Sequence, residues 1–276
     1  MSILRTRPSD LRLAFVVEGS HVPQNRTGTD LLEQLWRQEI PRATGCVRPD
    51  RVFGIHKGSI AAMRLKKVAL RRTTSIAEPL DDILERLRKS HQIDCFVVVW
   101  DLVPPWDRAA ATCRWNETLG LFEGLSLSKS LDEPFRHYAA TRFQEMSNRN
   151  SPRNRPSLPT IVRGAILAVC VDPLFESIFM NETAMRQSLG IRGTRVDRWP
   201  AKWEAWDRNA SNVVASAVDA ARGAAPNRPV FRRIRQGYDT LKSEWGVHFL
   251  QSGYFDTELR RHPLAKRLAE FRRPTR

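Results

Sequence analysis

Three acidic side chains stand at the ends of apolar runs in this 276-residue chain. Glu18 lies near the end of LRLAFVVEG, Asp101 ends IDCFVVVWD, and Asp172 directly follows AILAVCV. If the three runs are neighbouring parallel strands, their carboxylates lie at one edge of a sheet. Clustered carboxylates repel one another unless a cation lies between them, and oxygen ligands suit Mg²⁺ or Mn²⁺. We therefore expect Glu18, Asp101 and Asp172 to be metal ligands.

Glu176 lies one helical turn beyond Asp172 and could join this group. We expect catalysis to rest on Glu18, Asp101 and Glu176, because a metal held by such acids activates water and stabilises charge on a phosphoryl group. A structural interpretation stays open, since acids often follow strands simply because loops are polar. Asp172 before Pro173 is also typical of a helix N-cap, and Glu176 would then lie in a first turn that favours an anion.

The elements that would position these acids alternate along the chain. Runs rich in β-branched and aromatic residues predict strands, and apolar residues at helical spacing predict helices between them. This alternation indicates an α/β fold with a mostly parallel sheet flanked by helices. The predicted strands span 11–19, 51–55, 93–101 and 165–171, and the predicted helices span 30–40, 77–91, 131–147 and 172–190.

The motifs VVEGS at 16–20 and FVVVWD at 96–101 resemble the Toprim pattern, in which one strand ends in Glu-Gly and a later strand ends in Asp. RVFGI followed by HKGS, and VCVDPLFESIFM at 169–180, are similar to stretches of the OLD-type and related uncharacterised prokaryotic nuclease families. The resemblance covers about residues 10–190 and implies a Toprim-like sheet, a magnesium-dependent nuclease activity and a role in prokaryotic genome defence. The chain departs from the Asp-x-Asp of that pattern, because Val103 replaces the second aspartate.

The formal net charge of +15 predicts a polyanionic partner, DNA or RNA. Residues 222–276 hold 13 Lys and Arg against 5 Asp and Glu, about half of the excess. A solvated charged surface or an acidic protein partner would also fit this composition. The residues expected to contact nucleic acid are Lys57, Lys66, Lys67, Arg71, Arg232, Arg233, Arg235, Arg261, Lys266 and Arg267.

Several classes of protein do not fit the sequence. The chain has no apolar run long enough to span a membrane and no signal peptide, so a cytoplasmic location is expected. It contains no CxxC pair, P-loop, GxGxxG, GxSxG or HExxH motif, and its six histidines are scattered. His21 is close to Glu18 in the sequence and His56 follows a strand end, so either could serve as a proton carrier, but a hydrogen-bonded loop histidine is the commoner role for such residues.

Two functional hypotheses follow. The first is a nuclease dependent on Mg²⁺ or Mn²⁺, with a Toprim-like core over residues 1–198 and a basic, mainly helical region over 199–276. The second is a catalytically inactive nucleic-acid-binding or scaffold subunit of a larger defence complex, with protein partners. The missing second aspartate favours the second hypothesis, whereas the presence of Glu18 and Asp101 favours the first.

Overall fold

The computed structural model confirms the predicted α/β class. It describes residues 11–18, 31–55, 59–60, 78–101, 114–148, 160–171, 175–190 and 238–271, with a few positions between 214 and 231. Within them lies a four-stranded, all-parallel sheet of order β2-β1-β3-β4. The strands are β1 (Leu13–Glu18), β2 (Arg51–Ile55), β3 (Cys95–Asp101) and β4 (Ile166–Val171).

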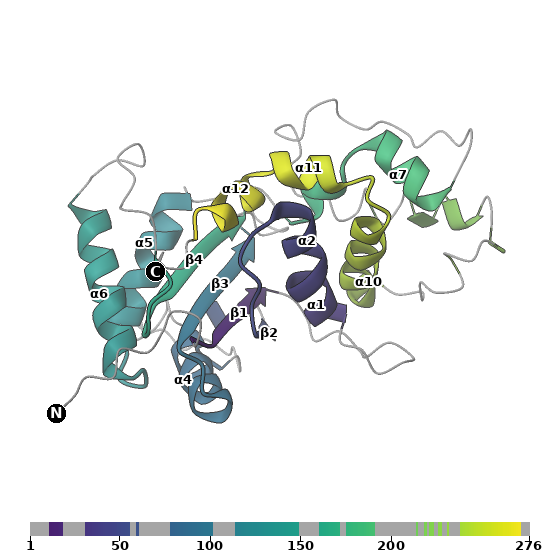
Figure 1. Cartoon of the computed structure of the whole chain (residues 1–276). Coiled ribbons are helices and arrows are strands. Elements are labelled where there is room, and N and C mark those ends of the chain that lie inside the picture. Colours follow the sequence, from purple (N-terminus) through teal and green to yellow (C-terminus); the bar gives the residue numbers. More distant parts are fainter. Residues whose placement is uncertain are drawn as a thin grey trace, which may run out of the picture.

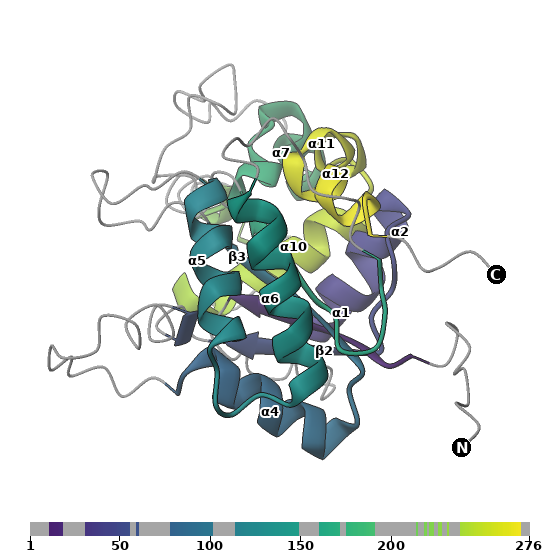
Figure 2. The ribbon, with the colours of Figure 1, turned by 90° about the vertical axis from the view of Figure 1, so that its left-hand side faces the viewer.

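Helices cover both faces of the sheet, which makes three layers (Figure 1). One face packs against α1 (Leu31–Gln34), the π-helix η2 (Leu35–Glu39) and α2 (Ile40–Thr44), and the buried residues of α7 (Glu182–Leu189) belong to the same core cluster. The other face packs against α4 (Leu80–His91), α5 (Arg114–Ser126) and α6 (Glu133–Ser147), and Figure 2 looks onto α5 and α6. The central strands β1 and β3 are apolar in almost every position because both of their faces are buried.

The order of the strands creates a switch point between β1 and β3. The helices α1 to α2, which precede β2, cover one face, whereas α4 and α5, which flank β3 in sequence, cover the other. The chain therefore leaves β1 and β3 toward opposite faces of the sheet. In open parallel sheets, ligands bind in the crevice outside the carboxyl ends of the strands at such a point.

Two helical segments differ from the sequence-based expectation. Residues 114–126 form α5, which was not predicted, because Gly120 and Gly124 interrupt its apolar spacing. The single helix predicted over 172–190 is divided in two. The 3₁₀ helix η3 (Phe175–Phe179) comes first, and then Asn181, with an extended backbone, accepts a bond from the Ala184 amide and begins α7.

Three C-terminal helices pack on the same face as α1 and α2. They are α10 (Tyr238–Gln251), α11 (Asp256–Arg261) and α12 (Pro263–Ala269). Phe249, Phe255, Leu259 and Leu268 on these helices, or between them, are fully buried in the core formed with the sheet, and α12 packs directly against β4. The described C-terminal helices therefore share one hydrophobic core with the sheet. The predicted domain boundary at 198–199 lies outside the described residues.

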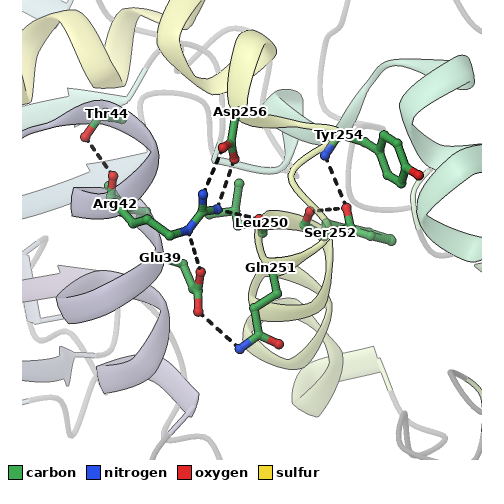
Figure 3. Close-up of polar contacts among 10 residues, drawn as sticks. Glu39, Arg42, Thr44, Leu250, Gln251, Ser252, Tyr254 and Asp256 are labelled. Carbon is green, nitrogen blue, oxygen red and sulfur yellow. Dashed lines mark hydrogen bonds and ion pairs between the residues drawn. The ribbon is translucent and has the colours of Figure 1, made fainter.

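A polar network fastens the C-terminal helices to α2 (Figure 3). The Arg42 guanidinium donates two bonds to the Asp256 carboxylate, at 2.9 and 3.0 Å, and one to the Leu250 carbonyl at 2.6 Å. It also donates to Glu39 at 3.2 Å, and the other Glu39 oxygen accepts a bond from the Gln251 amide at 3.1 Å. This network raises the pKa of Arg42, chiefly through its bond to Asp256. Arg42 therefore joins α2 to the end of α10 and the start of α11.

None of the helices in the described ranges is both long and apolar enough to cross a membrane.

Candidate functional site

Glu18 and Asp101 lie at the carboxyl ends of β1 and β3, the two central and adjacent strands. Val17 pairs with Val99 in the register, so Glu18 lies beside the end of β3. The Glu18 Oε2 atom accepts a hydrogen bond of 3.0 Å from the Asp101 main-chain N–H. The two residues thus lie side by side at one edge of the sheet, at its switch point, with the Glu18 carboxylate against the main chain of Asp101.

The two side chains leave the sheet on opposite faces. Alternation along the strand places Glu18 on the face of Val16, toward α4 and α5. The same alternation places Asp101 on the face of Val99, toward α1 and α2. The helix that follows β1 is α1, and Glu18 points to the opposite face of the sheet. The helix that follows β3 is α5, and Asp101 likewise points to the face opposite that helix. Glu18 has the longer side chain, and its carboxylate reaches the main chain of Asp101.

The Asp101 carboxylate is held from the β4 side of the sheet. Its Oδ1 atom accepts a bond of 2.9 Å from the Phe175 main-chain N–H at the start of η3. The Phe175 ring lies against Trp36 of η2, with 5.4 Å between ring centroids, and against Phe179, with 5.6 Å. Packing of these rings fixes the backbone that donates to Asp101.

Glu176 follows Phe175 in η3 and is only 5% exposed. It lies in a 3₁₀ turn rather than in the α-helix expected from the sequence. Asp172, the third expected metal ligand, lies outside the described residues. Neither its role as a ligand nor its alternative role as a helix cap is therefore tested.

The residues at this edge can be compared with the ligands that a hard cation needs. Across the described ranges, no group of three or more His, Cys, Asp or Glu side chains is arranged to hold a metal ion. Mg²⁺, however, usually binds through one or two carboxylates, several waters and substrate phosphates. A carboxylate has two oxygens and about four lone-pair positions, so accepting a main-chain N–H bond is compatible with coordination of a cation. Glu18 and Asp101 are carboxylates, the kind of donor that Mg²⁺ or Mn²⁺ prefers, and the bond between them joins the Glu18 carboxylate to the main chain of Asp101.

Three of the ten residues expected to contact nucleic acid are described, and all three belong to α11 or α12. The Arg261 side chain is 76% exposed and lies 4.0 Å from the Glu258 carboxylate, and Lys266 is exposed. Arg267 donates to Glu270 at 2.7 Å, so its charge is partly neutralised. Lys57, Lys66, Lys67, Arg71, Arg232, Arg233 and Arg235 lie outside the described residues.

A buried pair that the sequence did not reveal joins η3 to the C-terminal helices. Ser177 Oγ lies 2.7 Å from His262 Nε2, and both residues are at most 5% exposed. The other ring nitrogen, Nδ1, accepts a bond of 3.1 Å from the Leu264 N–H and caps α12. The neutral ring therefore carries its proton on Nε2 and donates it to Ser177 Oγ. Burial lowers the pKa of His262 to about 4, which keeps the ring neutral.

This arrangement argues against a serine nucleophile at Ser177. A histidine that activates serine must accept the hydroxyl proton, whereas His262 donates toward the hydroxyl. The pair is a structural link. The two residues are 85 positions apart, and neither lies in a recognisable motif, so only the tertiary structure could reveal the contact.

Two acids at the amino edge of the sheet provide a comparison. Asp50 Oδ2 accepts the Leu13 N–H at 2.8 Å, and Asp94 Oδ2 accepts the Arg12 N–H at 3.0 Å. Asp94 also forms an ion pair of 3.1 Å with Arg163. Both acids precede strands and fix the start of β1.

Comparison of the chain with protein-family models, with curated proteins and with solved structures found no match.

Proposed function

We propose that this protein is a metal-dependent phosphodiesterase acting on DNA or RNA, with Glu18 and Asp101 as ligands of Mg²⁺ or Mn²⁺. The observation that carries the proposal is the contact between Glu18 and the end of β3 at the switch point, where parallel sheets bind their ligands. We also propose, from the resemblance to Toprim-like nucleases, a role in prokaryotic defence. A cytoplasmic location is part of the same proposal.

Each residue of the proposed site would have a separate role. A divalent ion at this edge would supply Lewis-acid stabilisation of the phosphoryl oxygens and lower the pKa of bound water. Glu18 and Asp101 would hold the ion, and Asp172 is the proposed third ligand. Phe175 would keep the Asp101 carboxylate in place through its N–H. Glu176, next to Phe175 in η3, is the proposed further catalytic acid.

The net charge of +15 supports a nucleic acid as the partner, because basic side chains gain affinity from phosphate neutralisation. Arg261 and Lys266 are the exposed members of the basic set among the described residues. Contacts of this kind position a nucleic acid without reading its sequence.

Cleavage of labelled single- and double-stranded DNA and RNA with Mg²⁺, Mn²⁺ or a chelator tests the proposal. Wild-type protein should cleave at least one substrate only when metal is present, and Glu18→Gln should abolish this cleavage. The substitution keeps an oxygen that can accept the Asp101 N–H but removes the charge. The matched control is Asp50→Asn at the opposite edge, which should retain cleavage. Equal activity of Glu18→Gln and wild type would refute the assignment.

A second candidate, a nucleic-acid-binding subunit without activity, is favoured by a specific observation. Both candidate ligands accept main-chain N–H bonds, which is a structural role, and Val103 replaces the second acid of the Toprim pattern. This candidate predicts salt-sensitive binding of nucleic acid without cleavage. It also predicts that Lys266→Glu weakens retention at low salt while Glu18→Gln leaves retention unchanged.

A further inference from the structure

We propose that His262 and Ser177 position the acidic site, so that the C-terminal helices control the geometry of Asp101. The inference rests on the proposed metal site at Glu18 and Asp101. It adds two positioning residues, Ser177 in η3 and His262 in the distant C-terminal helices, whose mutual bond involves neither Glu18 nor Asp101.

A series of short contacts connects the two places. Glu18 accepts the Asp101 N–H at 3.0 Å, and Asp101 accepts the Phe175 N–H at 2.9 Å. Two residues later in the same 3₁₀ turn, the Ser177 hydroxyl meets His262 Nε2 at 2.7 Å. His262 lies between α11 and α12. The first two bonds share Asp101, and the second and third bonds are two residues apart in η3, at Phe175 and Ser177.

The donor at Phe175 depends on tertiary support. The helix η3 has only five residues, and a turn this short is not stable through its own hydrogen bonds. Its position is set by ring packing of Phe175 and Phe179 and by the Ser177–His262 bond. The ring of Phe179 contacts Phe255, which precedes α11, with 5.4 Å between centroids. The C-terminal helices therefore hold η3 at two points.

His262 is itself held firmly on the side away from η3. The Leu264 N–H fixes Nδ1, and the ring is 5% exposed. The helices beside it are fastened to α2 by Arg42 and by a bond of 2.6 Å from Arg260 to the Ala43 carbonyl. Because His262 is fixed in this way, its bond to Ser177 also fixes η3, and η3 in turn fixes the N–H group that binds Asp101. Groups that orient metal ligands commonly change metal affinity or activity by about 10–100-fold when they are removed.

Two substitutions of His262 separate its two bonds. In His262→Asn the side-chain oxygen takes the place of Nδ1 and can cap α12, but the side chain is too short for Ser177. In His262→Gln the longer amide has the reach to donate to Ser177. Ser177→Ala removes the same bond from the other side. The control is Ser188→Ala, which removes a serine–serine bond of 2.8 Å between α7 and the end of α10.

The primary measurement is the dissociation constant of Mn²⁺ for the full-length protein by titration calorimetry, at a temperature where circular dichroism shows each variant folded. We expect Ser177→Ala and His262→Asn to weaken Mn²⁺ binding about tenfold, and Ser188→Ala to stay within about twofold of wild type. His262→Gln should recover part of the loss seen with His262→Asn. In cleavage assays, kcat per folded molecule should fall while the KM for the nucleic acid stays unchanged.

The outcomes separate the inference from the function on which it rests. If wild type binds Mn²⁺ but does not cleave, nuclease activity is refuted and the inference is still judged from the dissociation constants. If Ser177→Ala binds and cleaves like Ser188→Ala, positioning by His262 is refuted and the proposed function stands. If wild type neither binds Mn²⁺ nor cleaves, both are overturned.

Discussion

The two edges of the sheet carry acidic side chains of the same kind in two different settings. At the amino edge, Asp50 and Asp94 accept the N–H groups that begin β1, and Asp94 pairs with Arg163. At the carboxyl edge, Glu18 and Asp101 also accept main-chain N–H groups. A hydrogen bond from the main chain therefore does not distinguish a structural acid from a functional one.

Position in the topology distinguishes the two edges. The amino-edge acids each precede a strand and help to start β1. Glu18 and Asp101 end the two central strands, between which the chain turns to opposite faces. In open parallel sheets, ligands bind outside the carboxyl ends of the strands at such a point. The proposed function places chemistry at the carboxyl edge and only a structural role at the amino edge, and substitutions can test both parts.

The largest expected effect is on activity at the carboxyl edge. Asp101→Asn keeps an oxygen for the Phe175 N–H but removes the charge that attracts the cation, so kcat should fall at least about 100-fold. Asp94→Asn, its counterpart at the start of β3, should leave kcat within about twofold of wild type. Steady-state kinetics on the cleaved substrate measures both, and a similar loss in the two variants would remove the distinction between the edges.

The next effect is a pH dependence of the free energy of unfolding, caused by His262 between the C-terminal helices α11 and α12. His262 has its pKa lowered to about 4 by burial, against 6.5 in the unfolded chain, so the unfolded state binds a proton more readily between these values. The contribution of this group to stability is complete above pH 6.5 and is lost as pH falls toward 4, by about 3 kcal/mol. Urea unfolding of wild type and His262→Gln at pH 7.5, 5.5 and 4.5 measures it. An identical pH dependence in the two proteins would contradict the assignment.

A smaller loss of stability is expected at Arg42. Its guanidinium is nearly half exposed, but it neutralises Glu39, which is buried, and Asp256. Arg42→Met should lower the free energy of unfolding by about 2 kcal/mol, because two carboxylates lose their shared cation. The matched control is Arg86→Met, whose ion pair with Glu78 is exposed on both sides and should change stability by less than about 0.5 kcal/mol. Equal effects in thermal unfolding would show that the network contributes little.

The smallest effect is expected at the amino edge. Asp50→Ala removes the acceptor of the Leu13 N–H, which should cost about 1 kcal/mol of unfolding free energy without changing cleavage. Urea unfolding and the cleavage assay on the same preparation test both parts. If Asp50→Ala lost cleavage but kept the stability of wild type, the functional site would lie at the amino edge instead.

The sequence predicts the strands well because each is a compact apolar run with a polar end. It also predicts the approach of Glu18 and Asp101, since parallel neighbours bring their carboxyl ends together. It fails at residues 114–126, where two glycines weaken the helical pattern, and at 172–190, where Asn181 starts a second helix inside one apolar segment. Helix type and start there depend on tertiary packing, which local spacing does not contain.

The sequence also could not reveal the support of the site. The bond between Ser177 and His262 joins residues 85 positions apart, and His262 looks like one of several scattered histidines until the fold buries it. The burial of Glu176 in a 3₁₀ turn is likewise a result of packing around Phe175 and Phe179. Acids at strand ends can be found from types and spacing, whereas the residues that hold them in place come from distant parts of the chain.

An anomalous difference map from crystals grown with Mn²⁺ tests the central claim most directly. The proposed site predicts a peak at the carboxyl edge, about 2.0–2.3 Å from carboxylate oxygens of Glu18 and Asp101, that disappears in Glu18→Gln crystals. A map with no peak at these two residues, or with its only peak beside Asp50 or Asp94, would contradict the claim.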